Sequence, residues 1–168
     1  SHPLLVSFLG VPFIDVRVSF NSFIPKKLDD KIASKLVNYY LNQLIQNLNK
    51  HDKVEFEIIF SCYYFGLETK LSKLLNYKFT KYELNLIEKS LLSLTNSIID
   101  VKNGLYKKDL EKSKILNQKF FEIINSELSL IDKVYWLIKD VKRYGTLPFA
   151  GVARAAFIAI QILRSFVD

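Results

Sequence analysis

Two stretches of the chain alternate between apolar and polar side chains with a period of two residues. The first covers residues 13–21 and the second residues 53–62. Because successive side chains of a strand point to opposite faces, each stretch is predicted to form a half-buried β-strand. The segment between the strands is long enough for either parallel or antiparallel pairing, so the direction stays open. We expect the two strands to form one small sheet.

Most of the remaining chain repeats its apolar residues every three to four positions, which is the spacing along one face of a helix. Helices are predicted over residues 25–50, 66–75, 81–101, 107–125 and 130–142. Thr80 with Glu83 and Ser129 with Asp132 have the spacing of capping boxes, which mark helix starts. The predicted fold class is therefore α+β and mostly α, a bundle of about five to six helices with a small two-stranded sheet.

Residues 143–157 join a basic, aromatic turn to a stretch rich in small residues. Gly145 is expected to end one helix in the left-handed conformation, and Thr146 to cap the next, with Pro148 in its first turn. Arg143 and Arg154 then lie near a helix N-terminus, where free backbone N–H groups favour an anion. The pattern leaves two interpretations open: an anion site, or a tightly packed helix with two surface arginines.

Composition and charge narrow the function classes. The 168 residues predict a single domain, 1–168. The net charge of +7 would suit nucleic acid, but the lysines are scattered along the predicted helices, which is typical of a solvated surface. No nucleic-acid partner is therefore expected. The one cysteine, Cys62, cannot form an internal disulfide and is predicted to be a core residue in a reducing compartment.

The chain has neither an uninterrupted run of 18 apolar residues nor a secretory signal. We therefore expect a cytoplasmic protein without membrane contact. The chain opens with Ser1 and His2 and contains no methionine. We interpret residues 1–2 as a tag remnant and the rest as a piece of a longer protein.

Familiar catalytic motifs are missing from the sequence. It contains no phosphate-binding glycine loop, no nucleophile elbow and no Cys/His cluster for a metal, so no metal ligand is predicted. His51 lies at a predicted helix–strand junction and is interpreted as a turn residue. A role for His51 as a general base is therefore not expected.

A polar face on the two predicted strands is the main candidate for ligand binding. It would carry Asp15, Arg17, Ser19, Asn21, Glu55 and Glu57. One interpretation is an arginine–glutamate cross-strand pair on a solvated sheet face. The other is a site for a zwitterion, in which arginine takes a carboxylate and glutamate takes an ammonium group.

Three segments resemble a known family. They are residues 15–25, residues 52–58 with 61–63, and residues 143–150 with 153–154. Together they are similar to the phosphoenolpyruvate-synthase-like ATP-dependent phosphotransferases of bacterial capsule and surface-polysaccharide clusters. The resemblance implies an enzyme in which an ATP-grasp domain phosphorylates a histidine on a mobile domain, which then delivers the phosphoryl group to an acceptor such as the L-glutamine amide.

This chain contains neither the nucleotide-binding region nor the histidine-bearing motif of that family. The resemblance therefore implies that it is the central, acceptor-binding domain of a larger multidomain kinase, with no catalytic residue of its own. ATP and Mg²⁺ are expected in the full-length enzyme, with no cofactor bound here, and the chain alone is expected to be inactive. Its expected partners are L-glutamine or a similar small acceptor, and the ATP-grasp and phosphohistidine domains of the same polypeptide.

The site residues receive expected roles on this basis. Arg17 would bind the acceptor carboxylate and Glu55 or Glu57 its ammonium group. Asn21 or Ser19 would orient the amide. Two further residues, Arg143 and Arg154, would stabilise the incoming phosphoryl group.

Two alternatives stay open. The chain could belong to a related phosphotransferase with another acceptor, such as pyruvate. It could instead be a non-catalytic helical scaffold whose polar strand face contacts a neighbouring domain.

Overall fold

The protein is described by a computed structural model that covers residues 2–167, so Ser1 of the predicted tag remnant lies outside the described residues. The predicted fold class is confirmed: 69% of the chain is helical and the sheet has two antiparallel strands. The described residues form two compact units. Unit 1 extends to Leu94 and resumes at Gln161, and unit 2 is Thr95–Ile160. This division does not test the single-domain prediction, because helices α5 (Lys81–Ile99) and α8 (Leu147–Arg164) belong to both units.

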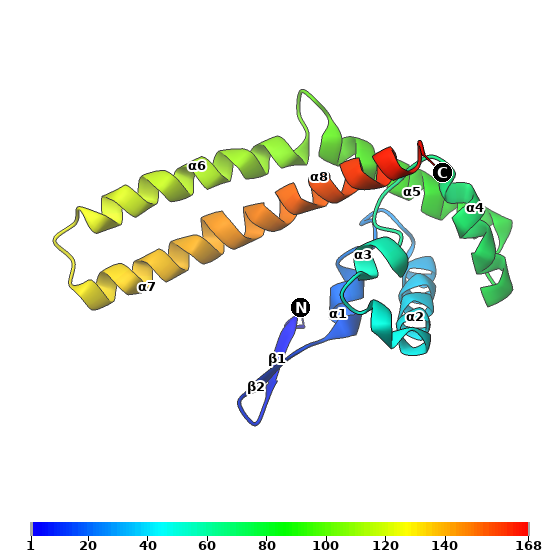
Figure 1. Cartoon of the computed structure of the whole chain (residues 1–168), viewed down its shortest axis with the longest axis horizontal. Coiled ribbons are helices and arrows are strands. Elements are labelled where there is room, and N and C mark those ends of the chain that lie inside the picture. Colours follow the sequence, from blue (N-terminus) through cyan, green and yellow to red (C-terminus); the bar gives the residue numbers. More distant parts are fainter. Residues whose placement is uncertain (1, 168) are drawn as a thin grey trace. The chain divides into compact units, whose positions relative to one another are not determined.

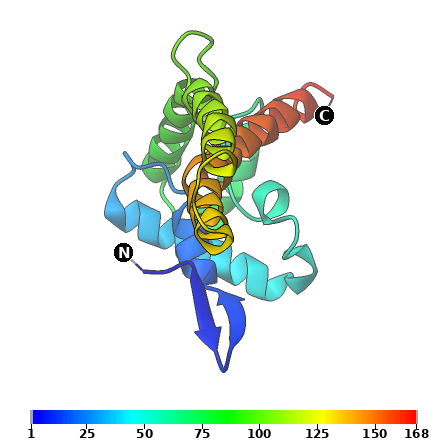
Figure 2. The same cartoon turned by 90° about the vertical axis from the view of Figure 1, so that its left-hand side faces the viewer.

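The sheet of unit 1 is a hairpin near the N-terminus (Figures 1 and 2). Strand β1 (Leu5–Phe8) pairs with β2 (Val11–Ile14), and Phe8 lies opposite Val11. Leu9 and Gly10 connect the strands with φ angles of 51° and 82°. Two successive residues of positive φ fit a tight hairpin turn whose twist matches that of the strands.

The predicted strand over residues 13–21 is wrong beyond Ile14. Residues Val16–Asn21 form helix α1, and the Asp15 side chain caps it by accepting a hydrogen bond from the Val18 N–H at 3.0 Å. This cap satisfies a backbone donor at the helix start and stabilises the helix over an extended strand. Phe20 is 1% exposed and meets the Tyr40 ring at 5.9 Å, so α1 packs on α2 (Asp30–Gln46).

The predicted strand over residues 53–62 is wrong as well. Val54–Glu57 forms the short helix α3, and Ile58, Ile59, Phe60, Ser61 and Cys62 follow it in irregular backbone, all of them buried. Residues buried in succession have no exposed face, so the period-two pattern did not mark a half-buried strand here. Cys62 is confirmed as a core residue, at 1% exposure.

The helix predictions agree well with the structure. In unit 1, α2 is followed by the 3₁₀ turn η1 (Leu48–Lys50), and α4 (Leu67–Ser72) by the 3₁₀ turn η2 (Lys73–Tyr77). In unit 2, α6 (Leu105–Ile124) lies beside α7 (Leu130–Asp140) as an antiparallel pair (Figure 1). Ser129 caps α7 by accepting from the Asp132 N–H at 3.2 Å, which confirms the predicted helix start. The Asp132 carboxylate accepts from the Ser129 hydroxyl at 2.7 Å, which is not the backbone bond of a full capping box.

The expected helix break at Gly145 is wrong. Residues Val141–Thr146 form the π-helical segment η3, which continues α7 directly into α8. Pro148 supplies no N–H, so one helical hydrogen bond is missing just after this segment. Gly145 lies inside the π segment, where an added Cβ would lie 3.2 Å from Leu116 Cδ2 of α6.

As a result, Leu130–Arg164 is one helical run of 35 residues, long and apolar enough to cross a membrane. Only 17% of its most apolar 18-residue stretch is buried. A single helix of this kind is weak support for a span, because core helices of soluble proteins have the same composition. The cytoplasmic location stays a prediction.

Candidate functional site: a mixed-charge pocket beside the π segment

A pocket of about 440 Å³ in unit 2 lies between α6, α7 and η3. Its volume falls within the range of small-molecule sites, about 300–1,000 Å³. The pocket is lined by Lys119, Glu122, Ile123, Ser126, Leu128, Trp136, Asp140, Arg143 and Tyr144. Its charged residues are two cations and two carboxylates, so the pocket is neutral overall while offering both signs.

The α6 side of the pocket carries an ion pair that is already formed. Lys119 Nζ lies 2.7 Å from Glu122 Oε2, and Gln118 donates to the other carboxylate oxygen at 2.8 Å. The hydrogen bond and charge of Glu122 raise the pKa of Lys119 above its usual value. In turn, Lys119 and then Gln118 lower the pKa of the Glu122 carboxyl. Both groups are therefore charged at neutral pH, and each is the main partner of the other.

The opposite side carries charges that remain available. Asp140 is the last residue of α7, and Arg143 lies three residues on in η3. Among residues 2–167, no side-chain hydrogen bond or ion pair engages either group. The Arg143 guanidinium lies 5.9 Å from the Tyr144 ring, within the range of a cation–π contact. This side can thus offer one arginine fork and one carboxylate to a ligand.

Arg143 and Tyr144 are successive residues of the π segment, and both line the pocket. A π turn is wider, and such segments occur often at functional sites. Packing of Gly145 on Leu116 holds this widened turn against α6.

The residues of the predicted polar strand face lie on two helices in the structure. Arg17, Ser19 and Asn21 lie on α1, and Glu55 and Glu57 on α3, all in unit 1. The shared strand face that grouped them is not formed, so that reason for the grouping is wrong.

Two of these residues have side-chain partners within unit 1. Arg17 donates to Asn38 Oδ1 at 2.9 Å, and Glu57 pairs with Lys50 at 3.1 Å. Their proposed binding roles stay predictions.

Of the two predicted arginines in unit 2, Arg143 lines the pocket, whereas Arg154 is half-buried on α8 and does not line it. The sequence reasoning missed Asp140, Lys119, Trp136 and Tyr144 as site residues. An available signal was the order Trp136–Asp140–Arg143–Tyr144, which places an aromatic, an acid and a base on successive helical turns.

The described residues contain no group of three His, Cys, Asp or Glu side chains that could hold a metal ion. His51 is a turn residue that directly follows η1, and its ring Nδ1 lies 3.0 Å from the carbonyl oxygen of Leu48 at the start of η1. Comparison of the chain with protein-family models, with curated proteins and with solved structures gives no match.

Proposed function

We propose that this chain is the acceptor-binding domain of an ATP-dependent L-glutamine kinase, a phosphoenolpyruvate-synthase-like enzyme of capsule phosphoramidate synthesis. The observation that supports it is the neutral pocket beside η3, in which Arg143 and Asp140 are both available to a ligand. An α-amino acid carries one carboxylate and one ammonium group, which is the charge pattern that this pair complements.

In the proposed complex, the Arg143 fork takes the role first expected of Arg17 and binds the α-carboxylate of glutamine. Asp140 takes the role expected of Glu55 or Glu57 and accepts from the α-ammonium group. The apolar part of the side chain lies along Trp136, and the amide lies between Tyr144 and Ser126. An arginine is better suited than a lysine here, because its planar fork can donate two parallel hydrogen bonds to one carboxylate.

The chemical step needs groups from the rest of the polypeptide. The phosphoryl group leaves a phosphohistidine as its N–P bond breaks, a new N–P bond forms to the glutamine amide nitrogen, and that nitrogen loses a proton. The role of this chain is to hold and orient the acceptor. Such positioning of a reactant by itself lowers the barrier of the reaction. ATP and Mg²⁺ bind to another domain. Arg154 stabilises the incoming phosphoryl group.

The single tryptophan makes a direct binding test available. Trp136 lines the pocket and is the only tryptophan in the chain, so its fluorescence reports on this site. Titration with L-glutamine should change that fluorescence and saturate. Replacement of Arg143 by Gln or of Asp140 by Asn should weaken binding about tenfold each, since each removes one charge-assisted hydrogen-bond partner.

The matched control is Lys142→Gln, which removes a neighbouring positive charge that does not line the pocket. It should bind glutamine as the parent chain does. Equal affinity in the Arg143→Gln and parent proteins would refute this site. Saturable binding of pyruvate but not glutamine would favour the related enzyme with another acceptor, because pyruvate has no ammonium group for Asp140.

A helical scaffold is the second candidate function, and one observation favours it. The apolar stripe of α7 is largely exposed, with Leu130 at 78%, Ile131 at 81% and Ile138 at 51%. Apolar helix faces of this kind commonly mark contacts with another protein surface. A chain that binds neither glutamine nor pyruvate, but associates with the isolated neighbouring domains, would support this function.

A further inference from the structure

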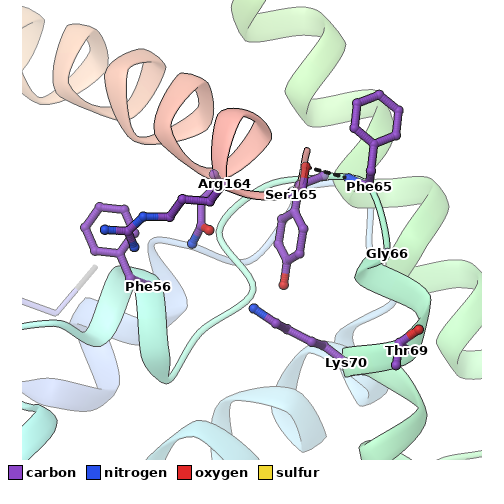
Figure 3. A pocket seen from close by; sticks show the side chains of 9 residues that line it. Phe56, Phe65, Gly66, Thr69, Lys70, Arg164 and Ser165 are labelled. Atoms are coloured by element: carbon purple, nitrogen blue, oxygen red, sulfur yellow. Dashed lines mark hydrogen bonds between the residues drawn. The ribbon is translucent and has the colours of Figure 1, made fainter. Parts of the chain in front are cut away.

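Unit 1 contains another pocket, of about 510 Å³, and none of the predicted site residues lines it. It lies between α3, the loop before α4 and the last turn of α8 (Figure 3). Its lining residues are Phe56, Tyr64, Phe65, Gly66, Thr69, Lys70, Gln161, Arg164 and Ser165. The pocket has the size of a small-molecule site.

The charges of this pocket are of one sign. Lys70 and Arg164 line it, and no carboxylate does. Each cation lies over an aromatic ring, with Lys70 Nζ 5.1 Å from the centre of Tyr64 and Arg164 Cζ 5.2 Å from that of Phe56. Within the described part of the chain, neither side chain has an ion pair or a hydrogen bond. Both positive charges are therefore available to an anion.

Gln161 adds a neutral hydrogen-bonding group to the pocket. It lines the pocket at 7% exposure, and in residues 2–167 its side chain makes no hydrogen bond. Its amide is therefore available to a ligand, as are the two cations. Burial also raises the pKa of the neighbouring Tyr64 to about 12, so that its hydroxyl stays neutral and able to donate.

The remaining wall is aromatic and fixed in place. Ser165 donates to the Ile162 carbonyl at 2.7 Å and accepts from the Phe65 N–H at 3.3 Å, which ties the loop to the end of α8. Phe65 also packs on Phe166, with ring centres 4.8 Å apart. Gly66, at φ +79°, allows the sharp entry into α4. Three aromatic side chains thus line the pocket beside two cations.

We propose that this pocket is a binding site for a small organic anion in which an aromatic ring carries a phosphate or carboxylate group. The ring stacks against Phe56, Tyr64 or Phe65, the anionic group lies between Lys70 and Arg164, and Gln161 donates to it from the pocket floor. This site is independent of the proposed glutamine pocket, since the two share no residue.

The test is a calorimetric titration of the 168-residue chain at low ionic strength with four probes: phenyl phosphate, benzoate, inorganic phosphate and phenol. Phenyl phosphate or benzoate, which carry both a ring and an anionic group, should bind more tightly than inorganic phosphate or phenol, which carry only one of the two. Lys70→Gln and Arg164→Gln should each weaken that binding about tenfold, because each removes one charge-assisted partner. Lys73→Gln, an exposed lysine of η2 outside the pocket, is the matched control and should bind normally.

Thermal unfolding should show that each variant is folded, because the substituted side chains are exposed. Trp136 fluorescence should not change with these probes, which separates this site from the glutamine pocket. Failure of every probe to bind at millimolar concentration would overturn the proposal. So would inorganic phosphate binding as tightly as phenyl phosphate, or unchanged affinity in both pocket variants.

Discussion

The start of α5 offers a prediction whose size can be worked from the structure. Glu83 accepts from the Thr80 N–H at 2.6 Å, and its own N–H donates to Thr80 Oγ1 at 3.2 Å, so the predicted capping box is confirmed. The same carboxylate accepts from Lys35 Nζ of α2 at 2.8 and 2.9 Å. Lys35 also donates to the Lys78 carbonyl at 2.7 Å and lies 4.3 Å from the Phe79 ring centre.

Two substitutions at this residue separate the two contributions. Glu83→Gln keeps a side chain that can complete the box but removes the charge, so it should cost about 0.5–1 kcal/mol, the upper range for an exposed ion pair. Glu83→Ala removes both the charge and the side chain that completes the capping box. Loss of the capping contact should add about 1 kcal/mol to the cost. We use the value for a partly exposed pair, because the side chains of Lys35 and Glu83 are 32% and 19% exposed.

The assay is denaturant unfolding at pH 7, with Glu88→Gln as the control, since Glu88 lies on the same helix and has no partner in the described residues. Free energies of unfolding should fall in the order parent and Glu88→Gln, then Glu83→Gln, then Glu83→Ala. Equal stability of Glu83→Ala and the parent chain would refute the reasoning. So would equal losses in Glu83→Gln and Glu88→Gln.

The pH dependence follows from the same contacts. The hydrogen bond from Lys35, followed by that from Thr80, lowers the pKa of Glu83 in the folded chain. Its contribution is therefore complete above the ordinary glutamate pKa and is lost as the pH falls through the lowered folded-state value. The stability difference between the parent chain and Glu83→Gln should shrink over that acidic range, as measured by unfolding at a series of pH values.

Two further predictions concern stability. Tyr40→Phe should cost about 1–3 kcal/mol, because the buried Tyr40 hydroxyl accepts from the Phe60 N–H at 3.2 Å and its removal leaves that donor unsatisfied. Tyr39→Phe is the control, and equal midpoints of chemical unfolding for the two variants would contradict this account. Gly104→Ala should cost about 1–3 kcal/mol, since a Cβ there would overlap the Asp100 carbonyl and lie 2.6 Å from that of Ile98. A thermal midpoint equal to that of the parent chain would show that this turn has room for a side chain.

The sequence predicted the helices well because their determinants are local. Apolar spacing and capping residues such as Thr80 and Ser129 act within one or two turns, and the structure keeps them. The strands failed for a different reason. The period-two pattern of residues 13–21 favours a strand, but the Asp15 side chain caps a helix that begins at Val16, and the helix forms. Residues 58–62 are buried on all sides, a property that depends on what surrounds them and not on their own pattern.

The candidate site was only partly predictable. Arg143 was found because a basic, aromatic stretch beside small residues is unusual in the sequence. Its neighbours in the pocket were not, since Lys119 and Glu122 come from α6 and reach the site only through helix–helix packing. The same holds for the pocket of unit 1, where Arg164 and Lys70 are far apart in the chain.

The π segment has a consequence for how this chain can change in length. A π turn holds one residue more than an α turn, because each N–H bonds five residues back rather than four. Deleting one residue of η3 would therefore convert it to α-helix and leave Gly151 packed on Asp109, its present neighbour on α6. The same deletion within α8 would instead turn Arg164 by about 100° around the helix axis. A change of one residue in chain length is thus accommodated at η3 without turning the rest of α8 around its axis.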